Sequence, residues 1–100
     1  MAQIKHIDDH LAEVQGDLLL GTVTDLLTEG NNLLARAGGQ WTVSLAGVGQ
    51  VSSAGVALLL EWMRTASRLN VQLSIRDLPE HMKPIINISD LDGVFESVLA

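Results

Sequence analysis

Apolar and polar residues alternate in two short segments near the start of the chain, residues 4–8 and 11–15. A two-residue period is typical of half-buried β-strands. The polar residues between the segments, Asp8, Asp9 and His10, are typical of a turn. The pattern therefore predicts an N-terminal β-hairpin.

From Thr22 onward the period becomes that of a helix, with apolar residues on one helical face: Val23, Leu26, Leu27, Leu34 and Ala37. Thr22 with Asp25 three residues later resembles a capping box, and Gly38 and Gly39 predict the end of the helix. Gly30 lies inside this segment, where glycine costs about 1 kcal/mol relative to alanine. The sequence therefore allows a kink at residues 30–32.

The rest of the chain continues to alternate between strand and helix patterns. Four segments follow in order: a strand over 41–46, a loop over 47–53, a helix over 54–69 and a strand over 71–76. Pro79 is placed to open a third helix, Pro84 interrupts or restarts it, and residues 91–100 hold a short strand or one helical turn. This order predicts an α/β fold, with a mixed, mostly parallel sheet and helices packed on at least one face.

The helix predicted over residues 54–69 has an unusually wide apolar arc of about 200°, whereas a surface helix typically shows a stripe of about 100° or somewhat more. Two interpretations follow. Either the helix lies between neighbouring elements and buries the whole arc, or one edge of the arc is a docking surface for another protein. The candidate edges are Val56 with Leu60, and Leu58 with Trp62.

Composition narrows the classes of protein. In 100 residues, 47% are apolar and 18% charged, which excludes a disordered chain and predicts one compact domain. The absence of cysteine excludes disulfides and thiol chemistry. A net charge of −6 with 3% aromatic residues argues against nucleic acid as a partner. No segment approaches the roughly 20 apolar residues of a membrane helix, and the N-terminus lacks a signal peptide, so we expect a cytoplasmic protein without direct membrane insertion.

Residues that carry chemistry are scarce. The three histidines, His6, His10 and His81, lack the spacing of a metal site, and no nucleotide-binding or nucleophile motif occurs. We therefore expect no enzymatic activity, no metal and no cofactor. One local feature remains: Ser52 or Ser53 is suited to cap the helix that follows, and the N–H groups of a helix start attract anions such as phosphate. The start of this helix is therefore either an ordinary serine cap or a binding or regulatory site.

Residues 51–59, Val-Ser-Ser-Ala-Gly-Val-Ala-Leu-Leu, resemble the signature loop and helix of STAS domains, the anti-sigma-factor-antagonist fold. Residues 14–18 resemble, more loosely, an earlier Gly-x-hydrophobic-Asp element of that family. The expected element order also fits. The resemblance covers essentially the whole chain and implies a single STAS domain over residues 1–100.

The chain departs from the antagonists at the residue that they phosphorylate. In those proteins the second serine of the run accepts phosphate, and here Ala54 takes that place; Ser53 keeps the first hydroxyl, and Ser52 replaces the preceding acidic residue. This variant resembles the STAS subunit of Mla phospholipid-transport ABC complexes of Gram-negative bacteria. The resemblance implies a non-catalytic cytoplasmic accessory subunit that maintains outer-membrane lipid asymmetry. It would bind the ATPase subunit, lie beside the inner membrane and its permease through that partner, and support assembly and activity.

The partner-binding residues that this resemblance implies belong to the loop and the helix after it: Ser52, Ser53, Ala54, Gly55, Val56, Ala57, Leu60 and Arg64. The small residues among them allow a close backbone approach. Two alternatives stay open. One is an anti-sigma-factor antagonist that binds an anti-sigma kinase, with Ser52 or Ser53 as phosphoacceptor. The other is a small enzyme or a domain that binds nucleotide or lipid.

Overall fold

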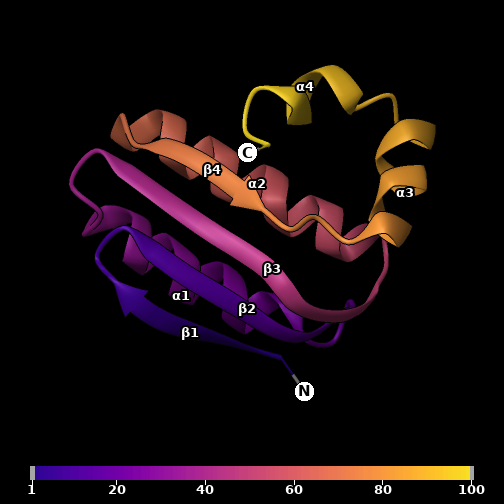
Figure 1. The fold of residues 1–100 in the computed structure, drawn as a ribbon, viewed down its shortest axis with the longest axis horizontal. Coiled ribbons are helices and arrows are strands. Elements are labelled where there is room, and N and C mark those ends of the chain that lie inside the picture. Colours follow the sequence, from indigo (N-terminus) through magenta and orange to yellow (C-terminus); the bar gives the residue numbers. More distant parts are fainter. Residues whose placement is uncertain (1, 100) are drawn as a thin grey trace.

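The structure, a computed structural model, describes residues 2–99. Its centre is a four-stranded sheet in the order β1-β2-β3-β4 (Figure 1). The strands are β1 (Gln3–Asp8), β2 (Leu11–Leu18), β3 (Gln40–Val51) and β4 (Gln72–Arg76). β1 and β2 form an antiparallel hairpin, and β2, β3 and β4 are parallel. The predicted α/β fold, with its N-terminal hairpin and mostly parallel sheet, is confirmed.

Two long helices connect the parallel strands and cover one face of the sheet. They are α1 (Val23–Ala35) between β2 and β3, and α2 (Ser53–Leu69) between β3 and β4, and both lie behind the sheet in Figure 1. The shorter helices η1 (Glu80–Met82), α3 (Lys83–Ile88) and α4 (Asp92–Glu96) lie beyond β4. The helix layer therefore has two main members, which pack against each other as well as against the strands.

The core lies between the sheet and these two helices. Alternate strand residues enter it, as the two-residue period requires: Ala12, Val14 and Leu18 from β2, Trp41, Val43 and Leu45 from β3, Leu73 and Ile75 from β4. Trp41 meets Trp62 of α2 edge to face, with ring centroids 5.7 Å apart. This contact ties α2 to the sheet.

Gly30 has a packing role, and α1 runs unbroken through it. A Cβ atom at this position would lie 2.2 Å from Nε1 of Trp62, so only glycine lets the two helices approach this closely. The indole Nε1 donates to the carbonyl of Leu27, 3.4 Å away, in the preceding turn of α1. The unfavourable helix propensity of glycine is thus offset by the packing that it permits.

Three local predictions are corrected. Residues 47–51 were predicted as loop but continue β3, because β2 still pairs with them, as in Gly16 with Val48. The capping box at Thr22 is wrong: its hydroxyl donates to the Asp17 carbonyl at 2.7 Å and accepts from the Leu19 N–H at 3.0 Å. Pro79 precedes a 3₁₀ turn rather than an α-helix.

The remaining boundaries agree with the sequence or resolve its alternatives. Gly38 and Gly39 follow α1 with positive φ values of 70° and 113°, as expected of residues that end a helix. Pro84 lies in the first turn of α3. Of the two alternatives predicted for the tail, the described residues show the helical turn, α4, followed by an isolated β-bridge between Leu99 and Ile75 and not by a strand. Ala100 lies outside the described residues.

Candidate functional site

The junction between β3 and α2 is ordered by a serine cap. Ser52 has extended backbone angles, and its hydroxyl accepts a hydrogen bond from the Ala54 N–H at 3.1 Å. This satisfies one of the free N–H groups at the helix start. Of the two candidates for this role, Ser52 is therefore the cap, and Ser53 is the exposed first residue of α2.

Gly55 and Val56 fix α2 against the sheet. A Cβ atom on Gly55 would lie 2.9 Å from Cβ of Leu18 at the end of β2, so glycine permits this approach. Val56 enters the core and is 4% exposed. Their contribution to partner contact stays a prediction, and the geometry gives both residues a packing role beneath the surface that Ser53 begins.

Most of the wide apolar arc of α2 faces the core. Leu58, Leu59 and Trp62 are buried, so the edge formed by Leu58 and Trp62 packs inside the molecule. Leu60 and Met63 are half-buried and lie toward the C-terminal helices. The arc is wide because α2 contacts the sheet, α1 and the C-terminal segment at once.

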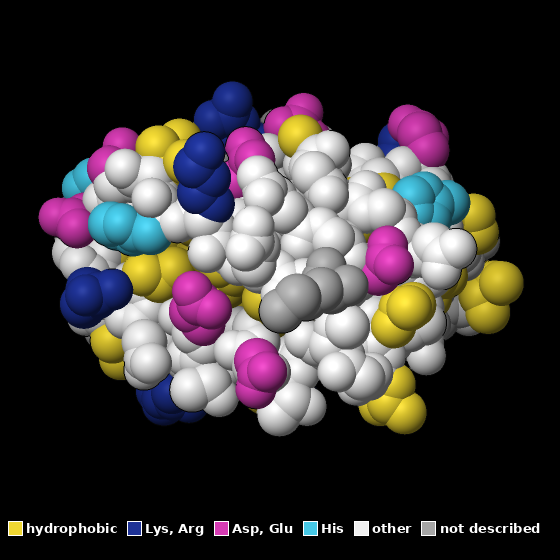
Figure 2. Space-filling view, turned by 90° about the horizontal axis from the view of Figure 1, so that it is seen from below, with side chains coloured by type: hydrophobic (Ala, Val, Ile, Leu, Met, Phe, Trp, Pro, Cys, Tyr) yellow, Lys and Arg dark blue, Asp and Glu magenta, His cyan; other side chains and the backbone are white. Residues whose placement is uncertain are grey.

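An apolar groove of about 210 Å³ lies between the first turns of α1 and α2, beside the Ser52–Ser53 junction. Its walls come from both helices and the loop before α1: Leu20, Val23, Thr24, Leu27, Ala54, Ala57, Leu58 and Glu61. Leu20 stands at its rim with 82% of its surface exposed. Figure 2 shows hydrophobic side chains protruding at the right-hand end of the molecule, the end at which the β3–α2 junction lies in Figure 1, and others at the left-hand end.

The predicted binding residues separate into two places. Ala54 and Ala57 line the groove between α1 and α2. Leu60 and Arg64 instead line a second hollow of about 400 Å³, between α2 and the loop and helix α4 near Leu91 and Val94. The guanidinium of Arg64 pairs with Glu61 one turn earlier, at 3.1 Å. The sequence motif at residues 51–59 thus marks one wall of the groove, and the predicted residues beyond it belong to a different surface.

The α1 wall of the groove was missed by sequence reasoning. Leu20 lies two residues after the end of β2, within a run of three leucines that begins at the last paired strand residue, Leu18. An apolar residue that continues beyond a strand into a loop before a glycine, Gly21, is the signal that marks it. Val23 and Leu27 were assigned only to the apolar face of their helix.

Within residues 2–99, no group of three or more His, Asp or Glu side chains is placed to hold a metal ion. No helix in that range has the length and apolar character needed to cross a bilayer. The groove and the adjacent start of α2 together form the candidate site.

Comparison with known families identifies the class. The family model described as "Mlab, STAS domain" matches residues 3–99. The protein is thus a STAS domain, a class of generally non-catalytic domains that mediate protein–protein interactions. Within that class, the chain belongs to the MlaB-type family. No curated protein matches it.

Solved structures share the fold at low sequence identity. An anti-sigma factor antagonist from Mycobacterium paratuberculosis superposes with a TM-score of 0.75 at 16% identity, over 99% of this chain and 83% of that one. A sulfate transporter family protein from Wolinella succinogenes gives 0.72 at 12% identity, over 97% and 80%. The unphosphorylated anti-sigma factor antagonist SpoIIAA gives 0.66 at 13% identity, over 88% and 83%.

Proposed function

We propose that this STAS domain is a non-catalytic accessory subunit that binds the ATPase of an ABC phospholipid transporter. Through that ATPase it would lie beside the membrane permease and support assembly and activity in maintaining outer-membrane lipid asymmetry. Membership of the MlaB-type family supports the class of partner. The observation that carries the proposal is the open apolar groove beside Ser53, in a chain where Ala54 replaces the phosphoacceptor.

The size of the groove favours a protein partner over a small molecule. Pockets for small ligands typically measure about 300–1,000 Å³ and enclose most of the ligand. The groove measures about 210 Å³ and opens to the surface past Leu20. It therefore fits one or two apolar side chains from a partner helix, flanked by close backbone contact at Ser53 and Ala57. Association of this kind draws its affinity from a few buried apolar anchors.

The alternative is an anti-sigma-factor antagonist regulated by phosphorylation. One observation favours it: Ser53 is exposed at the first position of α2, where N–H groups and the helix dipole stabilise a phosphate. This function requires phosphate on Ser52 or Ser53 after incubation with an anti-sigma kinase. Intact-mass and peptide mass spectrometry would decide, and a chain that stays unmodified excludes this alternative.

The proposed function is tested by measuring the affinity for the ABC ATPase subunit of the same organism. We expect Leu20→Asp to weaken binding at least about tenfold, because it places a carboxylate in an apolar contact. Ser53→Arg should also weaken it by filling the space needed for close approach. The matched control is Ile88→Asp, since Ile88 is 85% exposed and its helix, α3, does not line the groove.

The control also separates docking from stability. Leu20 and Ile88 are both largely exposed, so neither Leu20→Asp nor Ile88→Asp should change the thermal midpoint of unfolding appreciably. Wild-type binding by Leu20→Asp, or equal losses for Leu20→Asp and Ile88→Asp, would show that the groove is not the docking site.

A further inference from the structure

One peptide unit just before α2 is held at both of its edges by side chains. The carbonyl of Gly49 accepts a hydrogen bond from Nε2 of His81 at 2.7 Å. The N–H of Gln50, in the same peptide unit, donates to Oδ1 of Asp17 at 2.8 Å. In a trans peptide the C=O and N–H point in opposite directions, so the two side chains grip the unit from opposite sides. Such a unit cannot rotate without losing both contacts.

This part of β3 needs support from side chains because regular pairing fails around it. β4 pairs with β3 only as far as Ser44, so the rest of β3 has no β4 partner. On the other side, the register with β2 shifts between Gly16 and Leu18. Gly49 itself restricts the backbone very little. A Cβ atom there would lie 2.6 Å from Oδ1 of Asp17, so glycine also makes room for the carboxylate.

His81 is well placed to act as the second support. It precedes Met82, which is fully buried, and the Met82 N–H donates to the carbonyl of Pro79 at 3.0 Å. The backbone next to His81 is therefore held in place, and the exposed imidazole extends from it to Gly49. Because a carbonyl only accepts hydrogen bonds, Nε2 must carry a hydrogen, which is true of the protonated ring and of one neutral tautomer. The contact links the segment after β4 to the β3–α2 junction, which lie together in Figure 1.

We infer that His81 is a positioning residue for the docking surface. Together with Asp17, it fixes the Gly49–Gln50 peptide unit two residues before the Ser52 cap, and so sets the position of Ser53. This inference rests on the proposed function, because it concerns how the surface is presented to its partner. A surface held in its bound form loses less conformational entropy on association. Loss of one hydrogen bond of this kind should weaken binding roughly two- to tenfold.

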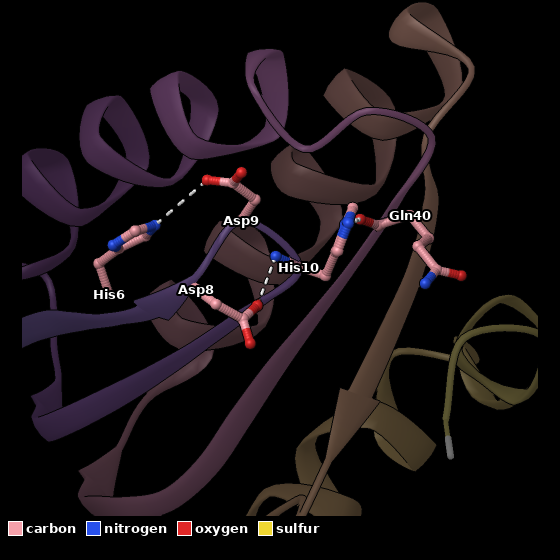
Figure 3. A network of polar contacts seen from close by, with 5 residues as sticks. All are labelled: His6, Asp8, Asp9, His10 and Gln40. Carbon is pink, nitrogen blue, oxygen red and sulfur yellow. Dashed lines mark hydrogen bonds and ion pairs between the residues drawn. The ribbon is translucent and has the colours of Figure 1, made fainter.

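The chain contains a matched control at the opposite end of the sheet. Nδ1 of His10 contacts the carbonyl of Gln40 at 3.0 Å, so His10 also links a ring nitrogen to a distant backbone carbonyl from an exposed position (Figure 3). The test compares His81→Ala, His81→Gln and His10→Ala. Glutamine retains an N–H donor. Two quantities are measured: amide hydrogen exchange of Gln50 and Ser52 in the free protein, and Kd for the ATPase subunit.

We expect His81→Ala to speed exchange at Gln50 and to raise Kd roughly two- to tenfold. His81→Gln should restore both at least in part, and His10→Ala should change neither. The inference is overturned if His81→Ala leaves exchange unchanged, if exchange changes while Kd does not, or if His10→Ala has the same effect. Failure of the wild-type protein to bind the ATPase would instead overturn the proposed function, and the exchange data would still report on the junction.

Discussion

The two ends of the sheet use their side chains differently. At the hairpin end, polar groups contact one another: the His10 N–H donates to Oδ1 of Asp8 at 2.7 Å, and His6 lies 4.0 Å from Asp9 (Figure 3). At the opposite end, an apolar groove opens beside the start of α2, with Leu20 exposed at its rim. At the first end these polar side chains contact groups within the chain. The second exposes apolar surface, which is the property expected of a binding site.

Glycine also has a different purpose at each end. Gly38 and Gly39, near the hairpin turn, have positive φ values, and added Cβ atoms there meet nothing closer than 4.0 Å. Gly49 and Gly55, at the groove end, have atoms within 3 Å of the position of a Cβ. The first pair supplies backbone freedom, and the second pair supplies space. Glycine thus permits the backbone turn at the hairpin end and permits close packing at the groove end.

The largest expected effect comes from the contact between the two long helices, Gly30 of α1 against Trp62 of α2, which lies outside both ends. Gly30→Ala places a methyl group within 2.2 to 2.5 Å of the indole, so we expect a loss of about 3 kcal/mol in the free energy of unfolding. Urea denaturation measures it. Gly93→Ala is the control, because a Cβ at Gly93 meets nothing within 4 Å and should cost almost nothing.

A double mutant checks the cause of this loss. Combining Gly30→Ala with Trp62→Leu removes the overlapping indole, so the double mutant should be less destabilised than the sum of the two single mutants. Additive losses, or a Gly30→Ala protein as stable as Gly93→Ala, would show that overlap with the indole of Trp62 is not what requires glycine at position 30.

A smaller effect should separate the two uses of glycine. At Gly38, φ is 70°, so asparagine, which tolerates the left-handed region, should cost less than alanine, whose penalty is about 1–2 kcal/mol. At Gly55, close to Leu18, the limit is space, so asparagine should cost more than alanine, by about 1–3 kcal/mol in total. Thermal or urea unfolding of the four variants gives both orders. If alanine and asparagine rank in the same order of stability at both positions, the two glycines do not differ in the way proposed.

Periodicity predicted the elements whose pattern is local. The hairpin, α1 and α2 follow from residues within each segment, and the motif at residues 51–59 placed the α2 start correctly. The continuation of β3 through Gly47 and Gly49 was missed because glycines favour a loop locally, whereas pairing with β2 is a long-range interaction. The five-residue α4 is too short for a periodic signal.

Only the part of the candidate site that has a local sequence pattern could be predicted. The run from Ser52 to Ala57 carries a recognisable local signature, and it marks one wall of the groove. Leu20 lines the groove only because of how α1 and α2 lie relative to each other, which no single segment encodes. His81 is 32 residues from Gly49, and its contact depends on where the chain runs after β4. Tertiary placement therefore accounts for what sequence reasoning did not find.

The smallest expected effects belong to the polar contacts of the hairpin end. Asp8→Ala removes the acceptor for the His10 N–H and should cost about 0.5–1.5 kcal/mol of unfolding free energy. Asp9→Asn should change it by less than about 0.5 kcal/mol, because the pair with His6 is long and its side chains are 80% and 49% exposed. Urea denaturation at pH 6 and pH 8 measures both. Neither variant should alter Kd for the ATPase, because this end faces away from the groove. Weaker binding by either would show that the hairpin end also contacts the partner, and the functional contrast between the two ends would fail.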